Sequence, residues 1–348
     1  MTQRSSEEAP RLVGLDTLRF VAAAIVTMSH IGDPPLTAGL QRTHPIAWFI
    51  SAAYGVWCNG PAAVIVFFLI SGLCIHYPCI DTPPNWPKYF VRRYIRIGIP
   101  LIASIGFCYV VGMTYLGLSE TILWSLQCEL IYYTLYPLLL LLRRRFGWMP
   151  LIVSSFVFAC GVIIAVNPWT ITYPKFGWHL NWAIGLPCWL LGCQLAERVR
   201  EKKPKVSERI WVWRFFVWLA SAIALALRFH SPIGYPWTLN AFSILVYFWL
   251  LEEIPHLAAV KVPKWTETLG VFSYSIYLVH LGAWELWKKY NKLKLGPLLD
   301  WASLMLTVLV VSYLFYRAFE APSHKLARYI ANAVGPKKKA SPVGQPSA

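Results

Sequence analysis

The sequence predicts an all-α polytopic membrane protein with about ten transmembrane helices, and three observations lead to that class. Of the 348 residues, 57% are hydrophobic and only 14% are charged, whereas a soluble protein of this length needs more polar side chains to cover its surface. Apolar runs close to the ~20 residues that cross a bilayer recur along the whole chain. Aromatic residues make up 16% of the chain, and many lie at the ends of those runs, where amphipathic rings favour the headgroup layer.

The apolar runs define the predicted elements in chain order. We expect membrane helices at residues 14–31, 60–77, 97–116, 121–142, 149–166, 179–197, 211–228, 236–252, 269–287 and 300–317. Turn-rich stretches such as DTPPNWPK (81–88) and NPWT (167–170) separate them. The connections are too short for a soluble domain. The predicted organisation is therefore a cytoplasmic segment over residues 1–13, one transmembrane domain over residues 14–322 and a basic, flexible cytoplasmic tail over residues 323–348.

The positive charge follows the predicted topology. If the N-terminus is cytoplasmic, the inside segments hold 24 of the 32 Lys and Arg residues and the outside segments hold seven, while Arg19 lies within the first span. This bias predicts that both termini are cytoplasmic. The net charge of +16 then reflects topology and attraction to anionic membrane lipids, and we expect no nucleic-acid partner. The exception is the basic loop KKYNKLK (288–294), which this topology places outside. Either earlier helices determine the topology in spite of its charge, or the loop contacts an anionic partner outside.

The eight cysteines lie mostly inside apolar runs, and none forms a C-x-x-C pair. We therefore expect buried thiols that behave as small hydrophobic side chains, and no metal site. The first apolar run is charged and no convincing cleavage site follows it, so we expect no cleavable signal peptide.

The first predicted span contains charged and titratable residues that a lipid-facing helix avoids. Residues 15–32 read LDTLRFVAAAIVTMSHIG and include Asp16, Arg19 and His30. Eleven helical residues make three turns plus roughly 20°, so Arg19 and His30 lie on one stripe, about 16 Å apart along the axis. Taken singly, Arg19 could pair with Asp16 near the headgroups, and His30 could be a buried, hydrogen-bonded imidazole. Together they favour a functional stripe that faces one internal cavity.

Six stretches extend this pattern along the chain. In GLDTLRFVAAAIVTMSH (14–30) ten residues separate an arginine from a histidine. After it come VIVFFLISG (64–72), RRYIRIGIP (92–100), LWSLQCELIYYTLYPLL (123–139), LGVFSYSIYLVH (269–280) and FEAP (319–322). In this order they resemble the motifs of the acyltransferase-3 family of integral membrane acyltransferases, with one extra residue before Pro100.

The resemblance implies an enzyme that moves an acyl group, usually acetyl, from cytoplasmic acyl-CoA to a carbohydrate hydroxyl. The acceptor would be an extracytoplasmic or lipid-linked glycan, so the expected role is O-acetylation in polysaccharide modification at a bacterial inner membrane. The expected donor is acetyl-CoA or another acyl-CoA, without a metal. A different class also fits the residues, because ten helices with buried charges would serve a transporter of a glycan or its precursor.

The basic residues before the third span are candidates for binding the donor. Arg93 and Arg96 match the family segment, and guanidinium groups at the inner face suit the phosphate oxygens of coenzyme A. They could instead serve only as topology signals. A second basic cluster at residues 143–145 is the weaker candidate. In this hypothesis the pantetheine arm of the donor passes Arg19 on its way to His30.

His30 is the candidate general base, since the free pKa of imidazole, about 6.5, lies near the working pH. A covalent acyl-histidine route is equally compatible with the sequence. Glu129, a carboxylate within the fourth predicted span, could orient His30 or pair with Arg19, and both roles stay open. Trp124, Ser125, Tyr277 and His280 match family motifs as candidates for substrate contact, although packing and interhelical hydrogen bonds would also explain them.

Overall fold

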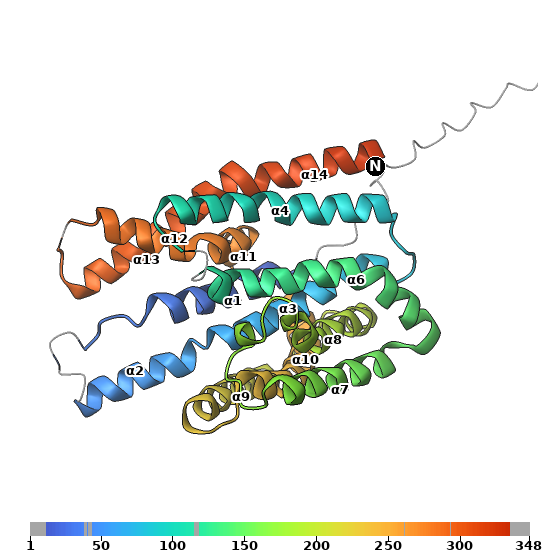
Figure 1. The fold of residues 1–348 in the computed structure, drawn as a ribbon, viewed down its shortest axis with the longest axis horizontal. Helices are drawn as coiled ribbons and strands as arrows, with labels where there is room; N and C mark the ends of the chain where they lie inside the picture. Colours follow the sequence, from blue (N-terminus) through green and yellow to red (C-terminus); the bar gives the residue numbers. More distant parts are fainter. Residues whose placement is uncertain are drawn as a thin grey trace, which may run out of the picture.

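The computed structural model describes residues 12–37, 40, 44–114, 118–260, 262–292 and 294–334, and these residues form helices joined by turns (Figure 1). The α-helices are α1 (Leu15–Ile31), α2 (Pro45–Trp57), α3 (Gly60–His76), α4 (Trp86–Val110), α6 (Trp124–Phe146), α7 (Trp148–Val166), α8 (Asn181–Glu201), α9 (Ile210–His230), α10 (Tyr235–Ala259), α11 (Lys264–Val271), α12 (Ser273–Tyr290), α13 (Pro297–Phe315) and α14 (Ala321–Val334). Shorter helical turns are η1 (Tyr77–Cys79), η2 (Ser119–Leu123), η3 (Tyr173–Phe176) and η4 (Tyr316–Glu320).

The predicted all-α class is confirmed, and each of the ten predicted apolar runs coincides largely with a helix. Seven helices in the described part of the chain are long and apolar enough to cross a membrane. The runs on α1, α8 and α12 are not among them, so ten spans are not established. Helix α4 begins at Trp86, well before the predicted residue 97, and takes in the whole arginine segment.

Two helices lie outside the predicted runs. Helix α2 precedes α3, and α14 occupies residues 321–334, where the sequence predicts the start of a flexible tail. Figure 1 shows α14 running alongside α4. The rest of the predicted tail, residues 335–348, lies outside the described residues, as do residues 1–11 of the predicted N-terminal segment.

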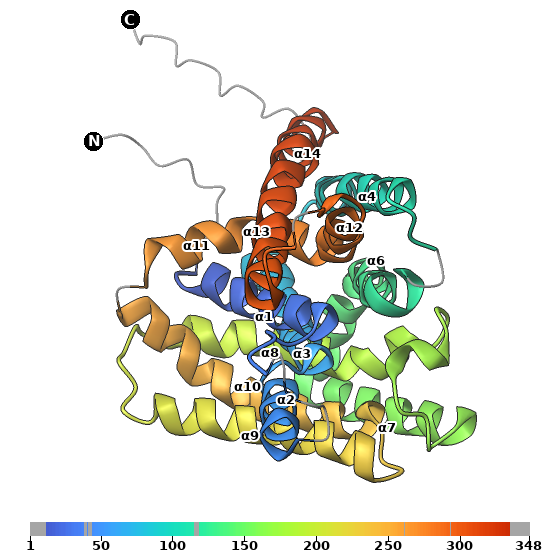
Figure 2. The same cartoon turned by 90° about the vertical axis from the view of Figure 1, so that its left-hand side faces the viewer.

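The centre of the molecule is a tight contact between α3 and α8 (Figures 1 and 2). Two glycines allow the backbones to touch. A Cβ atom added at Gly72 would lie 2.1 Å from the carbonyl oxygen of Trp189, and one added at Gly192 would lie 2.1 Å from that of Leu69. In lipid no hydrophobic effect drives helices together, so close van der Waals packing is a main source of their association. Small residues at such a crossing allow the two backbones to pack closely.

The peripheral helices turn apolar side chains outward. Only Ile210 and Ala224 of α9 are buried. Its exposed large side chains are Trp211, Val212, Phe215, Phe216, Ile223 and Phe229. Helix α9 is apolar on nearly every face, but only one of its faces packs against the protein. Such a helix suits a lipid environment. Together with the seven long apolar helices, this identifies an integral membrane protein.

Neighbouring elements fix both ends of α1. At its start the Glu267 carboxylate accepts hydrogen bonds from the backbone N–H and the hydroxyl of Thr17, at 3.1 and 2.7 Å. A carboxylate at this position also complements the positive end of the helix dipole. At its end the helix stops at Gly32, whose φ of 95° suits glycine. The Gly32 carbonyl accepts hydrogen bonds from the Tyr54 hydroxyl at 3.1 Å and the Trp301 indole at 3.3 Å.

A proline inside α6 links that helix to α4. Pro137 has no N–H, so the carbonyl of Tyr133 loses its usual partner within the helix. The hydroxyl of Tyr89 on α4 donates to this carbonyl at 3.2 Å. The pairing connects the two helices that carry Arg93 and Glu129.

The α3–α8 contact generates the first prediction. Replacing Gly192 with alanine forces the added methyl group into the Leu69 backbone, which should destabilise the protein by about 1–3 kcal/mol, as overpacking commonly does. The thermal unfolding midpoint of detergent-purified protein, followed by tryptophan fluorescence, measures this loss. Gly161→Ala on α7 is the matched control, because an added Cβ there meets nothing within 4 Å. Equal midpoints for the two variants would contradict the packing argument.

Candidate active site

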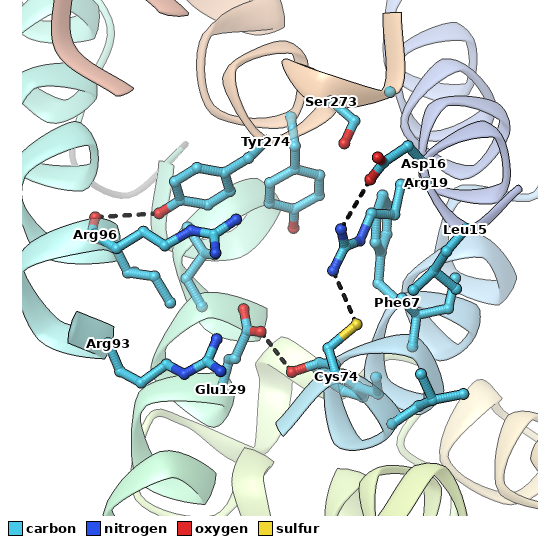
Figure 3. Close-up of a pocket in the computed structure, with 18 of the residues that line it drawn as sticks. Leu15, Asp16, Arg19, Phe67, Cys74, Arg93, Arg96, Glu129, Ser273 and Tyr274 are labelled. Atoms are coloured by element: carbon cyan, nitrogen blue, oxygen red, sulfur yellow. Dashed lines mark hydrogen bonds and ion pairs between the residues drawn. The ribbon is translucent and has the colours of Figure 1, made fainter. Parts of the chain in front are cut away.

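A cavity of about 540 Å³ opens among α1, α3, α4, α6 and α12, within the usual range of roughly 300–1,000 Å³ for small-molecule sites. Figure 3 shows the guanidinium groups of Arg19, Arg93 and Arg96 pointing into it, with the carboxylate of Glu129 between them. Arg19 comes from α1 and the other two arginines from α4. We refer to this space, lined by these four residues and their neighbours, as the arginine cavity.

The guanidinium group of Arg19 makes a contact through each of its two terminal nitrogens. Its Nη1 donates to the Asp16 carboxylate at 3.1 Å, and its Nη2 contacts the Cys74 sulfur on α3 at 3.1 Å. The predicted i,i+3 pair with Asp16 is therefore present. The pair does not lie against lipid, because both residues line the arginine cavity.

Arg93 and Arg96 lie on one face of α4, since residues three apart share a helix face. The Arg93 guanidinium carbon is 5.9 Å from the centre of the Tyr133 ring. This arrangement allows a cation–π contact. Together with Arg19, these two arginines place three positively charged groups in the cavity, which can therefore bind a polyanion.

Glu129 does not approach His30. Its Oε1 accepts hydrogen bonds from the hydroxyl of Ser71 at 2.6 Å and from that of Tyr133. Of the two roles left open for Glu129, orientation of His30 is thus not observed, and no ion pair joins it to Arg19 among the described residues. Glu129 shares the arginine cavity with Arg19 all the same.

Two residues of the motifs pair at the wall of the arginine cavity. The hydroxyl groups of Ser125 on α6 and Tyr277 on α12 lie 2.6 Å apart. The ring of Phe67 packs edge-on against Tyr277, with centroids 6.0 Å apart. Two candidate substrate contacts from distant parts of the sequence thus meet at the inner wall of the cavity.

His30 lines a second, smaller cavity of about 270 Å³. Its other lining residues include Trp124, Tyr173 and Tyr235, as well as the charged residues Glu120 and Lys175. The Trp124 and Tyr173 rings stack with centroids 5.4 Å apart. We call this space the histidine cavity. Val64 on α3 lines both cavities.

The sequence predicts that Arg19 and His30 face one channel, but the structure divides that channel in two. Arg19 lines the arginine cavity and His30 the histidine cavity. The spacing along α1 separates them, and the two cavities share one lining residue, Val64 on α3. Of the predicted site residues, the arginine cavity brings together Arg19, Arg93, Arg96, Glu129, Ser125 and Tyr277, while Trp124 joins His30.

His280 is the hydrogen-bond partner of His30. Nδ1 of His30 lies 2.8 Å from Nε2 of His280, and the ring planes differ by only 1°. The centroids are 5.1 Å apart, which matches the hydrogen bond plus the two ring radii, so the rings lie edge to edge in one plane. His280 is fully buried and lines neither cavity.

The second basic cluster, at residues 143–145, stays outside both cavities. Arg143 donates to the Glu197 carboxylate at 2.5 Å, and the same oxygen lies 2.9 Å from Nε2 of the buried His76. Arg144 and Arg145 are exposed. Arg143 is thus part of a structural network between α6 and α8.

Several cavity residues are absent from the sequence-based candidates. Tyr133 and Tyr274 stand inside the quoted motifs, so their motif positions were an available signal. Ser71 also stands inside a quoted motif, whereas Cys74 follows that motif on α3 with no signal of its own. Lys175 and Tyr173 come from the connection between α7 and α8, where no motif marks them. In the described ranges no group of His, Cys, Asp and Glu could hold a metal ion.

Comparison with known proteins agrees with the motifs. A family model for an acyltransferase domain matches residues 12–317 of the chain. The chain is also similar to acyltransferase MdmB of Streptomyces mycarofaciens, with 25% identity over 318 residues, an alignment that covers 78% of each protein. No solved structure matches the chain.

The cavity geometry predicts which thiols react. Cys74 lines the arginine cavity, whereas Cys128 and Cys188 are buried in the helix packing. N-ethylmaleimide should therefore modify Cys74 well before the other two in detergent-purified protein, as peptide mass spectrometry would show. Cys74→Ser should remove the fast phase alone. Modification of all three at one rate would contradict an accessible cavity at Arg19.

Proposed function

The chain belongs to the acyltransferase family whose domain model covers residues 12–317, and on that basis we propose that it transfers an acyl group, in the first instance acetyl, from acyl-CoA to a carbohydrate hydroxyl. The acceptor is an extracytoplasmic or lipid-linked glycan. One observation carries the proposal: a cavity with three arginines adjoins a cavity with a histidine, and one residue, Val64, lines both. A polyanionic donor and a neutral hydroxyl acceptor require two such unlike sites.

The arginine cavity is the donor site in this proposal. Guanidinium groups bind phosphate oxygens through charge-assisted hydrogen bonds, and Arg93 and Arg96 supply two of them on α4. A volume of about 540 Å³ suits the pantetheine arm with its thioester better than the whole coenzyme. The nucleotide therefore stays at the end of the cavity marked by Arg93 and Arg96, and the thioester reaches the Ser125–Tyr277 wall.

The histidine cavity receives the acceptor. Trp124, Tyr173 and Tyr235 offer the aromatic faces on which sugar rings pack, and His30 supplies a nitrogen that can accept a proton. The side chain of Val64, which lines both cavities, must shift for the thioester and the hydroxyl to meet.

His30 acts as the general base. It takes the proton from the acceptor hydroxyl as that oxygen bonds to the thioester carbonyl carbon. The carbon–sulfur bond then breaks, and the departing coenzyme A thiolate takes the proton from the imidazolium. The products are an ester and free coenzyme A. A covalent acyl-histidine route gives the same products, and trapping an acylated protein without acceptor would distinguish it from direct transfer.

The orientation follows from the basic segments. The start of α4 and the end of α6 lie at one end of the molecule (Figure 1), and each carries arginines or lysines. We assign this end to the cytoplasm of a bacterial cell, in the inner membrane, so that both termini are cytoplasmic. The donor then enters from the side where acyl-CoA is made.

The alternative of a glycan transporter is not favoured. An acyltransferase domain covers most of the chain, and a transporter has no need of a three-arginine site beside a hydrogen-bonded imidazole. Purified protein that released no coenzyme A from acetyl-CoA with any glycan acceptor, yet carried a glycan across vesicle membranes, would reverse this preference.

The donor site predicts a charge-specific effect on binding. Arg93→Gln with Arg96→Gln should raise the KM for acetyl-CoA at least tenfold, because each charge-assisted hydrogen bond contributes about 1.5–3 kcal/mol. Acetyl-CoA, which has no free thiol to consume the reagent, should also protect Cys74 from N-ethylmaleimide in the wild-type protein and not in this variant. Arg144→Gln with Arg145→Gln removes the same charge from exposed positions and serves as the control. An unchanged KM in correctly inserted protein would remove the assignment.

The proposed base predicts a loss of turnover. His30→Ala should lower kcat by about 10²–10⁴-fold with little change in the KM for acetyl-CoA, as expected for a general base. Release of coenzyme A by protein in lipid nanodiscs measures the rate, and mass spectrometry of surface glycans from cells with each variant identifies the acceptor. His230→Ala, at an exposed helix end, controls for the loss of a histidine. Turnover within tenfold of wild type would exclude His30 as the base.

A further inference from the structure

The two buried imidazoles of His30 and His280 form a chain of hydrogen bonds whose direction the surroundings determine. Nδ1 of His280 lies 2.9 Å from the carbonyl oxygen of Tyr277 and 3.2 Å from that of Ile276. Carbonyl oxygens only accept hydrogen bonds, so Nδ1 of His280 must carry a proton. The helix that bears His280 thus fixes one end of the chain.

The other nitrogen of His280 is consequently an acceptor. A neutral imidazole with a proton on Nδ1 has a lone pair on Nε2. The doubly protonated form is disfavoured because His280 is fully buried, and its hydrogen-bond partners among the described residues are two carbonyls and another imidazole, with no carboxylate. A buried cation needs a charged partner.

The proton between the rings must then come from His30. Its Nδ1 lies 2.8 Å from the lone pair of His280 Nε2, in the same ring plane, which is the geometry of a strong N–H···N hydrogen bond. The other nitrogen of His30, Nε2, keeps its lone pair. His30 lines the histidine cavity, whereas His280 lines neither of the two cavities described.

We infer that His280 is a positioning residue: it holds His30 in the tautomer with the proton on Nδ1 and aims the basic Nε2 at the histidine cavity. Hydrolytic triads use a carboxylate for this task. A neutral imidazole orients the base equally well but provides no negative charge to stabilise the imidazolium. The tautomer itself is independent of the proposed function, and only its effect on turnover rests on that function.

Nitrogen NMR measures the tautomer directly. Protein labelled with ¹⁵N-histidine in lipid should show, for His30, a protonated, pyrrole-type Nδ1 and an unprotonated, pyridine-type Nε2. A scalar coupling across the hydrogen bond should connect His30 Nδ1 with His280 Nε2. The spectra of His30→Gln and His280→Gln protein assign these signals among the eight histidines. A pyridine-type Nδ1 at His30 would overturn the inference.

Two substitutions separate positioning from packing. His280→Leu removes the acceptor, so the fixed tautomer of His30 should be lost and kcat should fall about 10- to 100-fold, as for other residues that orient an imidazole, with the KM for acetyl-CoA unchanged. His280→Gln offers an amide oxygen near the position of Nε2 and should restore both the fixed tautomer of His30 and the wild-type kcat. A His30 tautomer that persists in the leucine variant would refute positioning by His280.

The remaining outcomes are also decisive. If the His280→Leu protein does not fold, the inference is tested by the scalar coupling in the wild-type protein and by the His30 tautomer in the His280→Gln protein. If the tautomer depends on His280 but wild-type protein transfers no acyl group to any hydroxyl acceptor, the proposed function fails and the inference about the imidazole pair stands.

Discussion

The structure depends on one constraint: polar groups that lie within the membrane must find their partners inside the protein. The helix-interior prolines show how this is met. Pro255 frees the carbonyl of Leu251, and the ammonium group of Lys202 donates to it at 3.1 Å. The Tyr89–Tyr133 contact does the same at Pro137. Each freed carbonyl becomes a link between two helices, and the link between α4 and α6 joins two walls of the arginine cavity.

The same constraint sorts the helices into two kinds. Helices such as α7 and α9 expose large apolar side chains, whereas α1, α8 and α12 carry charged and titratable residues and fail as simple spans. The polar helices are packed among others: α8 against α3, and α12 against α1 and α13. An apolar periphery therefore permits a polar interior, and of the polar helices α1 lines both cavities and α12 lines the arginine cavity.

The sequence predicted the helical class, the family and the three arginines of the arginine cavity, because these depend on hydrophobic runs and on motifs with fixed spacing. Arg19 and Glu129 were recognised from the cost of intramembrane charge. The sequence did not predict that Arg19 and His30 face separate cavities, since the packing of other helices decides what lies between two residues on one stripe. The pairing of His30 with His280 joins positions 250 residues apart, and only the tertiary structure brings them together.

Val64 lines both cavities, while Phe67 and the Ser125–Tyr277 pair line the arginine cavity. In the proposed function the donor and the acceptor come from opposite sides of the membrane, and an open water-filled passage would let protons and ions run down their gradients. Two separate cavities that share one lining residue would keep the bilayer sealed while holding the two reactants close together. Chemistry across the membrane and a tight permeability barrier are thus compatible within one fold.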